Sequence, residues 1–285
     1  MSSLPERKRA RVDRKYHLVE HPTLYMNDGD VIIRARNTLF CVHHSLISKH
    51  SPVLRELLDA QEGIKPRFRG CRYLVSGNAK EDMEAFLSVI YDGFSFPRLT
   101  AENFLALSRI LRMATAYDVE PLRSGVVKLI KEEWPSALDK HDAKMDALRI
   151  RQMQRSPYAT QGGRIIVNPH YDPAIVAQGR DTTVHPASII VLLRECGYTD
   201  RELYFPLFYA MSLSTFQFGR PALGRNIAPL SYADIERFII GLERLRSRPM
   251  QMMIRVPAHM WPALDHYCFL EIRRFWPHLR GALLE

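Results

Sequence analysis

The side chains best suited to hold a metal ion are Cys41, His43 and His44, which lie close together in the sequence. Thiolate and imidazole groups are both good ligands for zinc. A closed zinc site needs a further ligand, and no Cys or His stands at a useful spacing from this group. We therefore predict that these residues are structural and that they bind no metal.

A second group, His259, His266 and Cys268, lies near the end of the chain. His266 and Cys268 flank a single residue, so they would not share one face of a helix. The sequence also lacks the Gly-rich phosphate loops, the zinc-protease motif and the nucleophile elbow of common enzyme families. We expect no metal, no cofactor and no catalytic activity.

The elements around the first group form a well-marked series in residues 30–58. Apolar runs at 31–33 and 39–42 surround the polar pair Asn37-Thr38, which predicts a β-hairpin. Leu46 and Ile47 indicate a short helix after the hairpin. Ser51-Pro52 then predicts the start of a capped helix.

Further elements follow at regular intervals. Residues 72–76 predict a strand, and the apolar spacing of Met83, Phe86, Leu87 and Ile90 predicts a helix. Helices are also expected after Thr100 and after Glu120, the last ending at Trp134-Pro135. For residues 16–29, which contain His21-Pro22, we expect a short extended segment rather than a long helix.

The order of these elements resembles a known family. Asp30-Val31, Phe40-x-x-His43, Leu46 and Ser51-x-x-Leu54 resemble the start of the BTB/POZ domain, and residues 86–93 and 99–122 resemble its later helices. The closest resemblance is to BTB proteins of fungi, of the basidiomycete type. It implies an α+β (α/β) fold at residues 16–134, in which a small sheet is flanked by helices.

The rest of the chain predicts three further regions. Residues 1–15 form a disordered basic tail. Residues 135–184 contain a charged helix and then an irregular linker, because 155–184 hold several Pro and Gly and show no period. Residues 185–285 form an all-α C-terminal domain, with helices at 187–195, 202–216, after Ser231, and at 261–283.

The resemblance implies that the protein binds other proteins and itself, most simply as a symmetric homodimer. It implies a non-catalytic scaffold or adaptor. The candidate dimer interface consists of Leu18, Leu24, Tyr25, Val31, Leu46 and Ile47. A candidate partner groove consists of Asp30 and His44, where transcriptional members of the family carry Arg or Lys in place of this histidine. A neutral imidazole is a weaker, pH-dependent partner.

Two uses of such a dimer remain open. An adaptor of a cullin-type ubiquitin ligase commonly carries a hydrophobic-x-Glu motif after the second helix. The nearest match is Ala60-Gln61-Glu62, in which Ala60 is a poor anchor and Glu62 is the acidic residue. The alternative is a nuclear, transcription-associated regulator, although no zinc finger follows.

Charge is concentrated at the N-terminus of a chain whose formal net charge is +9. The tail resembles a basic nuclear-import signal, but an inert tail or a nucleic-acid contact would have the same composition. The remaining charge is spread out, so a nucleic-acid partner is not favoured. We expect a nuclear or cytoplasmic protein with reduced cysteines, no secretory signal and no membrane span. The candidate import residues are Arg7, Lys8, Arg9, Arg11, Arg14 and Lys15.

Overall fold

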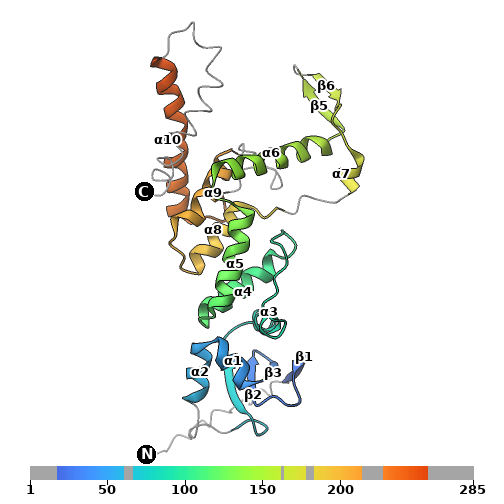
Figure 1. The fold of residues 1–285 in the computed structure, drawn as a ribbon, viewed down its shortest axis with the longest axis vertical. Helices are drawn as coiled ribbons and strands as arrows, with labels where there is room; N and C mark the ends of the chain where they lie inside the picture. The colour runs from blue at the N-terminus through green and yellow to red at the C-terminus, as the bar shows by residue number, and fades with distance from the viewer. Residues whose placement is uncertain (1–17, 61–66, 162–163, 178–182, 214–226, 256–285) are drawn as a thin grey trace, which may run out of the picture. The chain divides into compact units, whose positions relative to one another are not determined.

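The computed structural model describes residues 18–60, 67–161, 164–177, 183–213 and 227–255 (Figure 1). The chain divides into two compact units. The first contains Met1–Ser95 and Ala116–Glu120, and the second contains Phe96–Thr115 and Pro121–Glu285. The basic tail, Glu62 and the helix expected at 261–283 lie outside the described residues.

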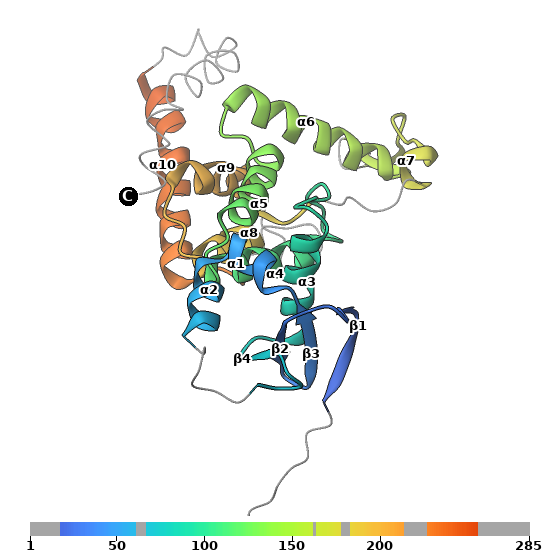
Figure 2. The same cartoon turned by 60° about the horizontal axis from the view of Figure 1, so that its bottom comes forward.

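The first unit is built on a four-stranded sheet. Its strands are β1 (Val19–Tyr25), β2 (Val31–Ala35), β3 (Thr38–Val42) and β4 (Arg72–Ser76). They are ordered β1-β3-β2-β4, as Figure 2 shows.

The two central strands form the predicted hairpin. They are antiparallel, and their register runs from Val31 opposite Val42 to Ala35 opposite Thr38. Arg36 at φ 53° makes the tight turn. Nearly every side chain of β2 and β3 is buried, which is why both strands read as continuous apolar runs instead of alternating ones.

The two edge strands both pair in parallel. β1 pairs with β3, Val19 lying opposite Thr38, and β4 pairs with β2, Arg72 lying opposite Val31. β1 confirms the extended segment expected in residues 16–29. Each edge strand exposes one valine, Val19 at 60% and Val75 at 61%.

Three helices complete the first unit: α1 (His44–His50), α2 (Pro52–Asp59) and α3 (Lys80–Tyr91). Ser51 caps α2 as predicted, because its Oγ accepts the N–H of Leu54 at 3.0 Å. The same hydroxyl donates to the Tyr117 carbonyl at 2.6 Å, which ties residues 116–120 into this unit. The predicted apolar face of α3 is buried, including Met83 and Phe86.

The second unit is mainly helical. Its principal helices are α4 (Phe104–Ala116), α5 (Glu120–Glu133), α8 (Pro186–Glu195), α9 (Arg201–Leu213) and α10 (Tyr232–Arg255). α8 ends at Gly197 with φ 72°, and the Tyr198 N–H donates to the Leu193 carbonyl at 3.0 Å. This is a Schellman motif, and it ends the helix that was predicted at 187–195. α9 is buried on all sides from Leu203 to Met211, as expected for a central helix.

The expectation of an irregular linker at 155–184 was wrong in part. The charged helix is present as α6 (Leu138–Arg155), but it is followed by a hairpin of β5 (Tyr158–Gln161) and β6 (Arg164–Val167) and by α7 (Pro173–Ala177). Gly162-Gly163 lies between the two strands, and Ile165, Ile166 and Val167 favour a strand. This apolar run is short and lies in a segment rich in Pro and Gly, so no strand was predicted there from the sequence.

Candidate protein-interaction site

The six residues of the candidate dimer interface divide into two groups. Leu24, Val31 and Ile47 are buried in the core of their own unit, with exposed fractions of 4%, 0% and 0%. Leu18, Tyr25 and Leu46 are half-buried and retain surface that a partner can cover. The hydroxyl of Tyr25 accepts a hydrogen bond from Arg69 at 2.9 Å, so its ring is held in place.

The two residues of the candidate groove lie together. The Asp30 carboxylate accepts the backbone N–H of His44 at 2.6 Å. The other side of His44 approaches a second acid, because its Nε2 lies 3.3 Å from an Asp59 oxygen. His44 therefore has one carboxylate at its backbone N–H, that of Asp30, and another near its ring, that of Asp59. A basic group of a partner would meet more negative charge here than the sequence indicated.

His43 joins the hairpin to α3. Its backbone N–H donates to the Tyr91 hydroxyl at 3.0 Å, and its Nδ1 lies 2.9 Å from the same oxygen. Since that hydroxyl has its own proton to donate, Nδ1 is the acceptor and Nε2 carries the ring proton. Nε2 lies 3.3 Å from Asp28. His43 thus links the end of β3 to the last residue of α3 through the Tyr91 hydroxyl.

Cys41 is a free, buried cysteine. Burial, with a smaller contribution from the neighbouring Cys71 thiol, raises the pKa of Cys41 to about 11. A thiol with this pKa stays protonated at neutral pH when no metal is bound. Among the residues that the structure describes, no group of three or more His, Cys, Asp or Glu side chains is placed to hold a metal ion.

The candidate cullin motif is only half described. Ala60 is exposed and forms the C-cap of α2, whereas Glu62 lies outside the described residues. On α2 itself, Leu57 is 42% exposed. An exposed apolar side chain is thus present one turn before Ala60, on the same helix.

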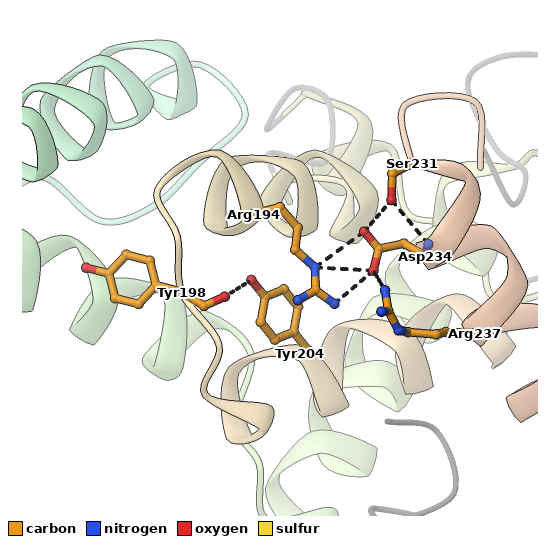
Figure 3. Close-up of polar contacts among 6 residues, drawn as sticks. All are labelled: Arg194, Tyr198, Tyr204, Ser231, Asp234 and Arg237. Carbon is orange, nitrogen blue, oxygen red and sulfur yellow. Dashed lines mark hydrogen bonds and ion pairs between the residues drawn. The ribbon is translucent and has the colours of Figure 1, made fainter. Parts of the chain in front are cut away.

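The second unit contains an ionic cluster that we did not predict (Figure 3). Asp234, at the start of α10, is 2% exposed, and its carboxylate accepts hydrogen bonds from Arg194 at 2.8 Å and from Arg237 at 3.1 Å. The Arg194 guanidinium also lies 4.1 Å from the centre of the Tyr204 ring. The Tyr204 hydroxyl donates to the Tyr198 carbonyl at 2.7 Å. The cluster therefore joins α8, α9 and α10.

The charge state of Asp234 follows from these contacts. Burial alone would raise its pKa, but hydrogen bonds from Arg194 and Ser231 and the charges of the two arginines lower the pKa below its usual value. The carboxylate is therefore ionised at neutral pH. Ser231-x-x-Asp234 was a visible signal for part of this cluster, because the Ser231 hydroxyl accepts the Asp234 N–H at 3.2 Å and donates to its carboxylate at 2.8 Å.

Comparison with known families identifies the first part of the chain. Residues 25–120 match the BTB/POZ domain. The matched BTB domain has the small mixed sheet flanked by helices that was predicted, and the part of the chain after it is helical. The match covers less than half of the chain, and no curated protein matches it.

A BTB/POZ domain is a protein–protein interaction module, and the family is not one of enzymes. None of the helices in the described ranges combines the length and the hydropathy needed to cross a bilayer.

Proposed function

We propose that the protein is a non-catalytic scaffold or adaptor that associates with itself through its BTB domain. The observation that carries this proposal is the BTB/POZ match at residues 25–120. The half-buried Leu18 and Tyr25 and the exposed Val19 support it, since they leave apolar surface on the edge strand β1, and the half-buried Leu46 leaves apolar surface on α1. The closeness to fungal BTB proteins stays a prediction.

Sedimentation velocity of the full chain at micromolar concentration tests self-association. We expect a dimer whose mass does not change with salt, because an apolar interface is little affected by screening. Val19→Asp and Leu46→Asp should each shift the protein toward the monomer. Val75→Asp is the matched control, because Val75 is as exposed as Val19 but lies on the opposite edge strand. A monomeric wild type, or equal effects of Val19→Asp and Val75→Asp, would contradict the proposal.

A second candidate function is that of a substrate adaptor for a cullin-type ubiquitin ligase. Leu57 and Ala60 support it, because both are exposed near the end of α2, where the motif is expected. Binding to a purified cullin should be lost on Leu57→Asp and weakened on Glu62→Ala. If the wild-type chain does not bind a cullin, this candidate function is excluded.

A third candidate is a nuclear, transcription-associated regulator. Its support is the basic tail, in which six Lys and Arg residues lie within positions 7–15. Replacing these six residues by Ala in the full chain should move a fluorescent fusion from the nucleus to the cytoplasm. An unchanged distribution would mean that the tail is not an import signal.

A further inference from the structure

The hairpin of the second unit carries an apolar face that no described residue covers. Tyr158, Ile165 and Val167 are exposed at 63%, 78% and 76%. Tyr158 is paired with Val167, and Thr160 with Ile165. Directly paired residues point to the same side of a sheet, and so do residues two apart on one strand, so the side chains of Tyr158, Ile165 and Val167 form one surface, here called the hairpin face. A two-stranded sheet is only marginally stable alone, so a covering layer would stabilise it.

The base of the hairpin is held firmly. The side-chain amide of Asn168, which is buried, donates to the carbonyls of Met153 at 2.6 Å and of Ser156 at 2.7 Å. The N–H of Asp172 donates to the Gln154 carbonyl at 2.9 Å. These bonds fix the hairpin to the C-terminal end of α6, beyond which it projects (Figure 1). The hairpin face is therefore presented in a defined orientation.

The outer edge of β6 is open to another strand. The Asn168 N–H donates to the Pro157 carbonyl at 2.9 Å, which makes residues 157 and 168 a hydrogen-bonded pair. Pairs alternate along an antiparallel ladder, so Ile165 and Val167 belong to the non-hydrogen-bonded pairs. Their N–H and C=O groups point away from β5, toward the outer edge. Such an edge is a template for strand pairing.

The charge near the hairpin favours one kind of partner. Arg151 and Arg164 are exposed, and Asp172 is the only acidic residue from 151 to 177. An Asp172 oxygen already accepts the N–H of Ala174 at 2.9 Å at the start of α7. A second copy of this chain would bring like charges together along the two edges, whereas an acidic chain would be attracted.

We propose that β6 binds an extended, acidic segment of a partner protein as a third strand. Apolar side chains at alternate positions of that segment would lie beside Ile165 and Val167 and extend the hairpin face. The acidic side chains between them would point to the other side of the sheet, on which Arg164 lies, since Arg164 is offset by one residue from Ile165. This surface is separate from the BTB domain and gives the protein a second contact.

The test uses the full chain and a fluorescently labelled synthetic peptide of about eight residues in which Val and Glu alternate. We expect saturable binding by fluorescence anisotropy. The double variant R164E/I165T should weaken binding by about tenfold or more, because it reverses the nearby charge and removes part of the apolar face. Ile239→Thr is the matched control, because this isoleucine is exposed on α10 and far along the chain from the hairpin. It should leave binding unchanged.

Four results would overturn the proposal. The first is no binding of the Val–Glu peptide. The second is equal binding of a Val–Lys peptide, and the third is equal binding of a Val–Glu peptide N-methylated at every peptide nitrogen, which has no N–H left to pair with β6. The fourth is loss of self-association in R164E/I165T, which would assign the edge to a second copy. Circular dichroism of each variant separates these results from unfolding.

Discussion

The carboxylate of Asp30 caps the helix that begins at His44, by accepting its backbone N–H at 2.6 Å. The N-cap residue His43 makes no side-chain cap of its own, because its ring is turned to Tyr91 and Asp28. Asp30, which precedes β2, thus accepts the first backbone N–H of α1, the helix that follows β3. The same carboxylate is a candidate contact for a partner, so its two roles must be tested separately.

Asp30→Ala should lower the free energy of unfolding by about 1 kcal/mol, because the cap of α1 is lost. Asp30→Asn should cost less, since an asparagine oxygen can accept the same N–H without the charge. Urea unfolding of the wild type and both variants measures the difference. Equal stability of the Ala and Asn variants would show that the cap contributes little. Partner binding that is lost in the stable Asn variant would assign a binding role to the charge.

Gly29→Ala should be destabilising by about 1–3 kcal/mol. A Cβ at position 29 would lie 2.8 Å from the Cys41 sulfur and 3.0 Å from the Cys41 backbone carbon, which cannot move without disturbing β3. Thermal unfolding checks this. Gly77→Ala is the control, because a Cβ there meets nothing within 4 Å, and it should be neutral or slightly stabilising. Equal melting temperatures for the two variants would contradict the packing argument.

Stability should fall on acidification because of His141. Its ring is fully buried, between the rings of Trp134 and Tyr209 at centroid distances of 6.1 and 5.2 Å. Burial lowers the pKa of His141 to about 4; the Pro135 carbonyl opposes this shift and the Lys144 charge adds to it. The unfolded chain, with a histidine pKa of about 6.5, therefore binds the proton more readily than the folded one.

This histidine's contribution is complete above pH 6.5 and is lost progressively as the pH falls from 6.5 toward 4. By pH 5 the loss should reach about 2 kcal/mol. Urea unfolding at a series of pH values measures it. His141→Phe keeps the aromatic packing but does not titrate, so its stability should vary less over this range. If the variant showed the same slope as the wild type, another group would be responsible.

Asp234→Ala should destabilise the second unit by about 2 kcal/mol. It removes the common acceptor of two guanidinium groups, but both arginines are partly exposed, so the cost is below that of a fully buried pair. Arg237→Ala, which removes the more exposed arginine, should cost clearly less. Because the pKa of Asp234 is lowered in the folded state, its contribution should persist above pH 4 and disappear below it. Chemical denaturation followed by circular dichroism provides the comparison.

Features with a local cause could be predicted from the sequence. The hairpin at 31–42, the Ser51 cap and the helix at 187–195 each depend on a few neighbouring residues, and each was predicted. The parallel pairing of β1 with β3 was not predicted, because an extended segment does not reveal which strand it joins. The link from Arg194 to Asp234 joins residues 40 positions apart, and no local pattern indicates it.

Prediction of the candidate dimer interface from the sequence is limited in the same way. Apolar side chains at 24, 31 and 47 were predicted to meet a partner, but the structure places them in the core of their own unit. An apolar pattern predicts that a side chain avoids water; it does not predict whether the covering surface comes from the same chain or from another. Half-burial, which separates Leu18, Tyr25 and Leu46 from the others, is visible only in three dimensions.

The bonds that Asn168 and Asp172 make with the last turn of α6 bring the entry and the exit of the hairpin to one point. The segment between the entry and the exit therefore forms a separate structural unit. If this segment were deleted and the chain were rejoined by a short linker, the helices before and after it would remain unstrained. The same position would accept a foreign loop of a different length, which makes it a natural place to insert a reporter or an epitope.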